Sequence, residues 1–328
     1  MARTGISHLP LHGGHAPPWL FQRMVRLARQ VTLAVVEEFG PHVMLERLSH
    51  PFWFQAFGCL LGFDWHSSGV TTTVCGALKE GLRGLERDTG LFVAGGKGRT
   101  SRQTPREVEA FGDRFGVDAG RLVYVSRMTA KVDSSALQDG YQIYHHTLFF
   151  TQDGAWAVVQ QGMNGASGWA RRYHWHSAAV ADFVCEPHAA VCSDATAAVL
   201  NMVAAESGPA REASAALARE DPERVLRTLG DPERLDLPAR HHVTPADLRP
   251  DSLRRVLAAA HQAYPRDFEA LLATPGIGPQ AVRALALAAE VIYGARPSTR
   301  DPVRYSFAHG GKDGHPYPVD RRTYDHTI

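Results

Sequence analysis

The stretch GYQIYHHTLFFTQDGAWAVVQQGM, residues 140–163, decides the fold of this chain. Two runs rich in aromatic and β-branched residues flank the dipeptide Asp153-Gly154. Such a dipeptide between two β-rich runs is typical of a hairpin with a two-residue turn. We therefore predict two long antiparallel strands here.

A two-residue turn also fixes which residues of the hairpin face each other. The expected pairs are Gln152 with Ala155, His146 with Gln161, and His145 with Gly162. Because side chains alternate between the faces of a sheet, one face should carry a set of mostly polar and aromatic residues, namely Gln142, Tyr144, His146, Gln161 and Met163. Such a face is unusual for a core and could hold a site, although it also suits an ordinary half-solvated sheet.

The sequence before the hairpin is mostly helical in pattern. Apolar residues recur at helical spacing over residues 17–38, and further apolar segments cover 51–62 and 71–85. Residues 91–94 and 122–125 have the composition of short strands. The chain is therefore expected to begin with helices and to continue into an antiparallel sheet, which makes the fold class α+β.

The sequence after the hairpin changes in composition. Residues 206–250 are rich in Ala, Glu, Arg, Asp and Pro, which is typical of a partly helical connector. An Ala- and Leu-rich helical pattern then resumes and runs to Gly294. We predict an α+β domain over 1–205, a connector over 206–250, and an all-α domain with an ordered tail over 251–328.

The composition limits the classes of partner. The chain has 328 residues with 44% hydrophobic and 21% charged residues and a formal net charge of +1. Binding to nucleic acid or membrane by bulk charge alone is therefore not expected. The four cysteines form no CxxC pair, and no leader or long apolar run is present. We expect a cytoplasmic protein with reduced thiols and no membrane partner.

The segment FEALLATPGIGPQAVRAL, residues 268–285, resembles a helix-hairpin-helix nucleic-acid-binding motif. Gly276 and Gly278 permit a tight hairpin, and Ile277 can pack between the two helices. The start of the second helix then presents unpaired N–H groups to a phosphate, independently of base sequence. A helical hairpin used only for packing is the alternative. The strand-cleaving DNA glycosylases that share the motif carry lysine where this chain has Gln280, so a Schiff-base mechanism at that position is not expected.

Candidate catalytic residues lie in the larger predicted domain. Carboxylates and imidazoles near the strands could hold Mg²⁺ or Mn²⁺ and move protons. This pool contains Asp64, His66, Asp133, Asp139, His145 and His146, of which Asp139 and His146 are the candidate metal ligands. Basic side chains could guide a nucleic-acid strand: Lys97, Arg99, Arg102, Arg171 and Arg172. Each has a structural alternative, such as helix capping, a solvated turn or an ordinary strand residue.

Several motifs together resemble the prokaryotic family catalogued as domain of unknown function 763, over nearly the whole chain. They are Arg3-Thr4-Gly5-Ile6 with Leu9-Pro10-Leu11-His12, Pro51-Phe52-Trp53-Phe54-Gln55, Phe63-Asp64-Trp65-His66-Ser67-Ser68-Gly69, Ala94-Gly95-Gly96-Lys97-Gly98, and Tyr305-Ser306-Phe307-Ala308-His309-Gly310-Gly311-Lys312-Asp313-Gly314. The resemblance implies no particular activity, so function must rest on the residues.

The combined prediction is a DNA-processing or repair protein, namely a nuclease dependent on Mg²⁺ or Mn²⁺ that holds nucleic acid through the hairpin. DNA is favoured over RNA as the partner, and the sequence leaves both open. One alternative is a base-excision glycosylase in which Asp320 or Asp139 stabilises a cationic sugar. The other is a nucleic-acid-binding adaptor without catalytic activity. Cleavage that requires a metal would indicate the nuclease, and base release in EDTA would indicate the glycosylase. Binding without any product would indicate the adaptor.

Overall fold

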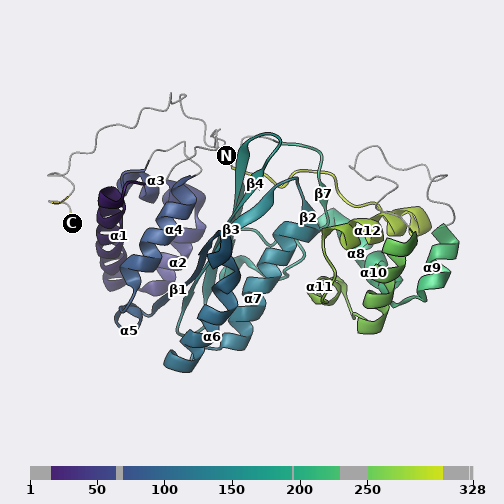
Figure 1. Cartoon of the computed structure of the whole chain (residues 1–328), viewed down its shortest axis with the longest axis horizontal. Coiled ribbons are helices and arrows are strands. Elements are labelled where there is room, and N and C mark those ends of the chain that lie inside the picture. The colour runs from purple at the N-terminus through teal and green to yellow at the C-terminus, as the bar shows by residue number, and fades with distance from the viewer. Residues whose placement is uncertain (1–15, 64–68, 194–195, 230–249, 306–324, 326–327) are drawn as a thin grey trace.

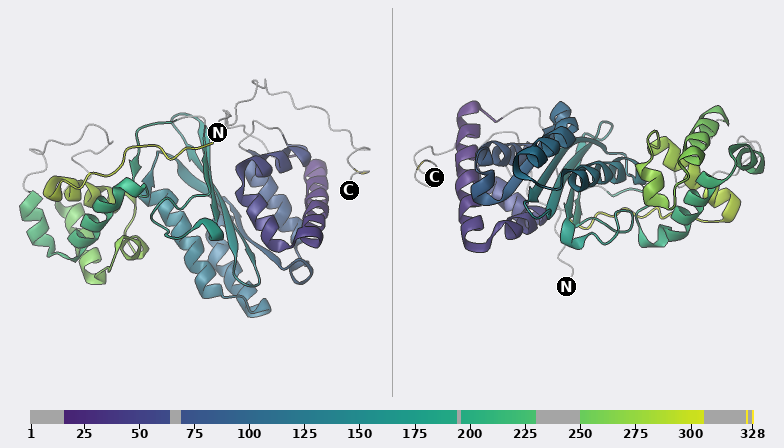
Figure 2. Two further views of the ribbon diagram at one scale, coloured as in Figure 1. Left: turned by 180° about the vertical axis from the view of Figure 1, so that it is seen from behind. Right: turned by 90° about the horizontal axis from the view of Figure 1, so that it is seen from below.

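The computed structural model describes residues 16–63, 69–193, 196–229, 250–305, 325 and 328. A central antiparallel sheet lies between two helical layers, and a further group of helices packs beyond one of them (Figure 1). The two further views keep this order of layers (Figure 2). The predicted class, α+β with an antiparallel sheet, is confirmed.

The main sheet has five strands in the order β1-β3-β4-β5-β6, with all neighbours antiparallel. Its strands are β1 (Leu91–Lys97), β3 (Gln142–Thr151), β4 (Trp156–Asn164), β5 (Trp169–His176) and β6 (Ala190–Cys192). A separate two-stranded sheet pairs β2 (Leu137–Gln138) with β7 (Leu200–Asn201). The hairpin predicted from residues 140–163 therefore forms the centre of the larger sheet.

The hairpin register is shifted by one residue from the prediction. The Thr151 amide donates to the Ala155 carbonyl at 2.9 Å, and the Gly154 amide donates to the Thr151 carbonyl at 3.0 Å. Gly154 takes a left-handed φ of 85°. The loop is thus three residues long, a form in which the last residue adopts this conformation. His146 consequently pairs with Gln160, not Gln161. The prediction of a shared face for His146 and Gln161 was wrong, because a slip of one residue moves a side chain to the opposite face.

The first face of the sheet is covered by the N-terminal helices. These are α1 (Pro18–Phe39), α2 (Pro41–Ser49), α3 (Pro51–Leu60), α4 (Gly69–Leu82) and the short α5 (Glu86–Thr89). Their apolar stripes pack on the odd-numbered residues of β1, β3 and β4, for example Val93, Phe149 and Val159. The helices predicted over residues 17–38, 51–62 and 71–85 are confirmed.

The second face is covered by α6 (Thr104–Phe115) and α7 (Ala119–Lys131). The strand predicted at residues 122–125 was wrong, because this segment lies inside α7. Asp118 caps that helix by accepting a hydrogen bond from the Arg121 amide at 3.0 Å. Leu122, Val125 and Thr129 are buried at helical spacing, so the apolar run serves one helix face.

Helices also occupy part of the segment that we predicted as a connector. Helices α8 (Gly208–Arg219) and α9 (Pro222–Leu229) pack with α10 (Pro250–Ala263), α11 (Phe268–Ala273) and α12 (Pro279–Tyr293). We call α8–α12 the C-terminal helical unit. Residues 230–249 lie outside the described chain.

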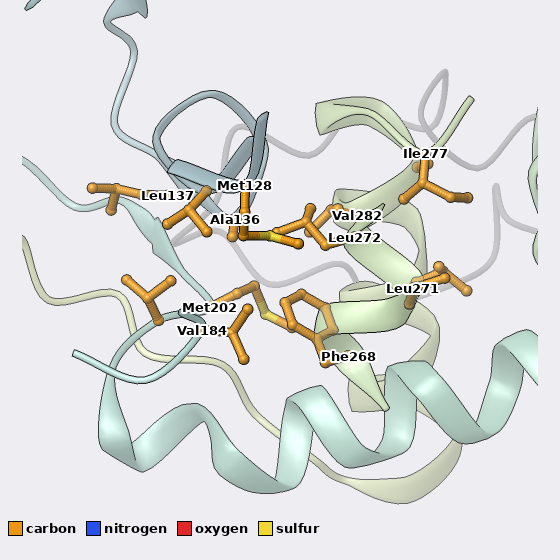
Figure 3. Close-up of a cluster of buried hydrophobic side chains, with 14 of the residues drawn as sticks. Met128, Ala136, Leu137, Val184, Met202, Phe268, Leu271, Leu272, Ile277 and Val282 are labelled. Carbon is orange, nitrogen blue, oxygen red and sulfur yellow. The ribbon is translucent and has the colours of Figure 1, made fainter. Parts of the chain in front are cut away.

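The C-terminal helical unit shares a hydrophobic core with the rest of the molecule. Figure 3 shows Phe268, Leu272 and Val282 meeting Met128 and Met202 across the boundary. After α12 the chain returns to the sheets, where Ser298 bridges Asn201 and Tyr305 bridges Cys192. The returning residues 298–305 therefore join the helical unit to the edges of both sheets.

Candidate functional site

The hairpin between α11 and α12 has its glycines on an open surface. Asp267 caps α11 by accepting from the Ala270 amide at 2.8 Å, and Gly278 is the N-cap of α12. Gly276 takes a φ of 85°, which glycine adopts without strain. A Cβ added at Gly276 or Gly278 would meet no atom within 4 Å. The outer side of the hairpin is therefore accessible to a ligand.

The inner side of the hairpin is fixed by contacts. The Ile277 side chain is 1% exposed and lies in the shared core (Figure 3), so only its backbone could contact nucleic acid. Lys131 donates to the Ile277 carbonyl, and Gln138 donates to the Pro279 carbonyl at 2.7 Å. These contacts from α7 and β2 hold the hairpin in one orientation.

Basic side chains lie beside the hairpin on α7. Lys131 reaches the hairpin itself, and Arg127 lies one turn earlier with an exposed side chain. Partial burial lowers the pKa of the Lys131 ammonium. A bound anion would offset this desolvation cost. Our sequence reasoning missed both residues because it assigned residues 122–125 to a strand; a helical reading places Arg127 and Lys131 on one face.

Asp133 is the centre of a buried polar network. It lies in the π-helix Val132–Ala136 and has no exposed surface. Its carboxylate accepts from Gln160 Nε2 at 2.5 Å and from Trp175 Nε1 at 2.9 Å. His188 Nε2 lies 2.5 Å from the other carboxylate oxygen. His188 was missed by the sequence analysis, since it is distant from Asp133 along the chain and belongs to no motif.

The same network extends to His146. Gln160 Oε1 lies 2.9 Å from His146 Nδ1, and Ser126 Oγ lies 2.9 Å from His146 Nε2. Burial lowers the pKa of His146 and favours its neutral form. The structure thus brings two predicted catalytic residues, Asp133 and His146, into one network through Gln160.

Asp139 belongs to a different buried cluster. Its carboxylate accepts from Arg171 at 2.9 Å and from Tyr173 at 2.6 Å, and Arg171 also donates to Asp301 at 2.8 Å. Burial raises the pKa of the Asp139 carboxyl, and Arg171 and Tyr173 limit this rise. The Asp139 carboxylate is therefore the counterion of a buried arginine.

Arg171 and Arg172 cannot guide a nucleic-acid strand, which corrects the prediction. Both side chains lie within the protein, at 1% and 0% exposure. Arg172 donates to Gln55 at 2.9 Å and to His174 Nε2 at 2.8 Å, on the face covered by the N-terminal helices. Neither guanidinium reaches the surface where a phosphate could bind.

His145 lies across the sheet from His146. Its Nε2 is 3.0 Å from Thr147 Oγ1, and complete burial lowers its pKa to about 3. Adjacent strand residues point to opposite faces, so the two imidazoles cannot act on one substrate atom. The predicted pool of catalytic residues is thereby divided between the two faces.

The remaining predicted residues lie apart from these networks. Lys97, Arg99 and Arg102 are exposed, at the end of β1 and in the 3-10 helix Gly98–Gln103. Their role as strand guides stays a prediction. The other candidates fall outside the described residues: Asp64, His66 and Asp320.

The described residues do not fit the predicted metal site. Asp139 and His146 belong to separate networks. The Asp139 carboxylate is hydrogen-bonded to Arg171 and Tyr173. The His146 imidazole is hydrogen-bonded to Ser126 and Gln160. Among the described residues, no group of three or more His, Cys, Asp or Glu side chains is placed to hold a metal ion. The metal therefore stays a prediction from the sequence alone.

Together the sheet, its two helical layers and the docked helical unit define an α+β protein with an open helical hairpin on its surface. The chain belongs to the family described as Protein of unknown function (DUF763), whose model matches residues 5–319. Comparison with curated proteins and with solved structures gives no match. None of the helices in the described part of the chain is long and apolar enough to cross a membrane.

Proposed function

We propose that this protein binds nucleic acid by its phosphate backbone through residues 274–280 and acts in DNA processing or repair. The observation that carries the proposal is the open outer side of Gly276 and Gly278 at the start of α12. The first amides of a helix lack intrahelical partners and favour an anion. Backbone amides recognise phosphate without reading base sequence.

The charges around the hairpin support the same proposal. Lys131 reaches the hairpin, and Arg127 extends the positive charge along α7. Each ammonium or guanidinium that meets a phosphate releases counterions and makes the affinity depend on salt. A local basic surface of this kind agrees with a net charge of only +1.

The chemical step predicted from the sequence, phosphodiester cleavage with Mg²⁺ or Mn²⁺, stays a prediction. Asp133 and Asp139 are both buried and engaged by neighbouring donors. The binding role is accordingly the part of the function that the described geometry supports.

A pair of substitutions at Gly278 tests the binding role. Gly278 has a φ of -124°, so a side chain adds no backbone strain, and both Asp and Asn are good N-cap residues. Gly278→Asp adds a negative charge at the phosphate position, whereas Gly278→Asn adds the same shape without charge. We expect Gly278→Asp to weaken binding of duplex DNA by about tenfold or more. Gly278→Asn should stay within about threefold of the unmodified chain.

Equal affinities of the two variants would reject the hairpin as the phosphate contact. The same titrations, repeated with single-stranded, flap and RNA substrates in Mg²⁺, Mn²⁺ or EDTA, report on the chemistry. Cleavage that needs a metal would support the nuclease. Alkali-labile sites formed in EDTA would support the glycosylase, and intact substrate in every condition would support the adaptor.

A further inference from the structure

A pocket of 320 Å³ lies between the segment that leads into β6, strand β7 and the returning residues 300–304. Its volume is within the range of small-ligand sites. The polar side chains that line it are Glu186, His188, Asn201, Arg300, Asp301 and Arg304. None of them belongs to the hairpin.

His188 lines this pocket and has one ring nitrogen engaged by a carboxylate. Its Nε2 is bonded to Asp133 at 2.5 Å, while Nδ1 has no hydrogen-bond partner among the described residues. The ring is also held edge-on against Trp175, with centroids 4.6 Å apart. A carboxylate bonded to one nitrogen fixes the ring orientation and directs the other nitrogen to a ligand.

Asp133, which binds His188, is held in a fixed position within an unusual backbone segment. Asp133 is fixed by two neutral donors, Gln160 and Trp175, and lies in a π-helix. Short π-helical segments occur frequently at functional sites. Two residues before His188, Glu186 takes a left-handed φ of 45°, a conformation that costs free energy in a residue other than glycine.

The charges of the pocket favour an anion. Arg300 and Arg304 are exposed at its rim. Of the two carboxylates, Asp301 is bonded to the buried Arg171 at 2.8 Å. Glu186 lies 3.7 Å from Arg304, a longer contact that a ligand could replace. Guanidinium groups bind phosphate oxygens through paired hydrogen bonds.

We propose that this pocket binds the phosphate monoester of a nucleotide, with Arg300, Arg304 and His188 Nδ1 as its contacts. The choice of a nucleotide rests on the proposed function, whereas the phosphate follows from the pocket itself. The pocket and the hairpin adjoin the same small sheet: Asn201 of β7 lines the pocket, and Gln138 of β2 contacts Pro279. The phosphate could belong to a free mononucleotide or to the end of a nucleic-acid strand.

Calorimetric titration of the full chain tests the inference with five probes. These are adenosine monophosphate, adenosine, inorganic phosphate, and one single-stranded oligonucleotide with either a 5′-phosphate or a 5′-hydroxyl. The double variant Arg300→Gln/Arg304→Gln removes the rim charges at exposed positions. His188→Gln keeps an amide nitrogen near the position of Nε2, where it can still donate to Asp133, and removes Nδ1. Arg255→Gln, an exposed change on α10, is the matched control.

We expect binding of adenosine monophosphate to weaken by about tenfold or more in the double variant and in His188→Gln, with no change in Arg255→Gln. A preference for the 5′-phosphorylated strand that the double variant abolishes would assign the phosphate to a strand end. Equal affinity for adenosine in place of its monophosphate, or undiminished phosphate binding in the double variant, would overturn the inference. Gly278→Asp should leave mononucleotide binding intact, so failure of the hairpin and failure of the pocket are distinguishable.

Discussion

At the scale of the residue, several polar side chains that were expected at a surface site are buried and paired. Arg171 and Asp139 form a buried ion pair, and His145 and His146 lie on opposite faces of the sheet. The types of these residues suggested catalytic or binding roles. Whether their side chains are buried depends on which strands become neighbours in the sheet. Local patterns of the sequence do not specify these neighbours.

Removal of the Asp139 carboxylate should destabilise the protein without affecting DNA binding. Asp139→Ala leaves the buried Arg171 with Asp301 as its remaining described carboxylate partner. Breaking a buried ion pair from one side costs about 3–5 kcal/mol in free energy of unfolding. Urea denaturation measures this loss. A stability equal to that of the unmodified chain would contradict the structural role of Asp139.

Stability should decrease in mild acid because of the buried histidines. The pKa of His145 is lowered from 6.5 to about 3 in the folded chain, and burial lowers that of His146 and His174 as well. The unfolded chain therefore binds protons below about pH 6.5 that the folded chain excludes. Each such histidine reduces the free energy of unfolding by about 1.4 kcal/mol per pH unit as the pH falls toward the folded pKa.

Urea unfolding at a series of pH values checks this dependence. His145→Gln retains a polar side chain but cannot take up a proton, so its stability should fall less steeply with pH. Identical slopes for this variant and the unmodified chain would show that His145 does not contribute to the acid sensitivity.

At the scale of the element, sequence patterns located most helices and strands but not their exact partners. The first long helix and the central hairpin were predicted, since both have strong periodic patterns. The register failed by one residue because the loop has three residues instead of two. Helix α7 was read as a strand because its apolar run is short, and local propensity cannot decide such a segment.

The basic side chains of α7 should contribute to the salt dependence of DNA binding. Lys131→Gln and Arg127→Gln should each weaken binding and lower the slope of log affinity against log salt by about 0.9 per lost phosphate contact. Fluorescence anisotropy at several salt concentrations measures this slope. Arg121→Gln is the control, since Arg121 lies on the same helix but near the β3–β4 turn at Gly154. A slope that changes equally in all three variants would reject a specific role for Arg127 and Lys131.

At the scale of the whole molecule, the shared core makes the helical unit part of one structure. Phe268 and Leu272 pack against Met128 and Met202, and residues 298–305 return to the sheets. The sequence analysis placed a connector at residues 206–250 between two domains, because the composition of that segment is polar. Helix α8 packs against α12, a contact between segments distant in the sequence that local patterns did not predict. The two helices joined by a glycine-containing turn over residues 268–285 were predicted from the sequence, whereas the His188–Asp133 pair was not.

The shared core predicts cooperative unfolding of the whole chain. Circular dichroism, dominated by helices, and the fluorescence of buried tryptophans such as Trp175 should give coincident transitions. Phe268→Ala should lower the free energy of unfolding by about 3–5 kcal/mol, because it removes a buried aromatic ring from the boundary. Two separate transitions in the unmodified chain would show that the units unfold independently.

Hydrogen–deuterium exchange with and without duplex DNA tests the central claim most directly. The claim is that backbone amides at the start of α12 contact the phosphate backbone. It predicts slower exchange on DNA binding in a peptide that covers residues 276–283, with no change in a peptide from α8. Protection confined to other parts of the chain, or unchanged exchange at 276–283 with DNA bound, would contradict it.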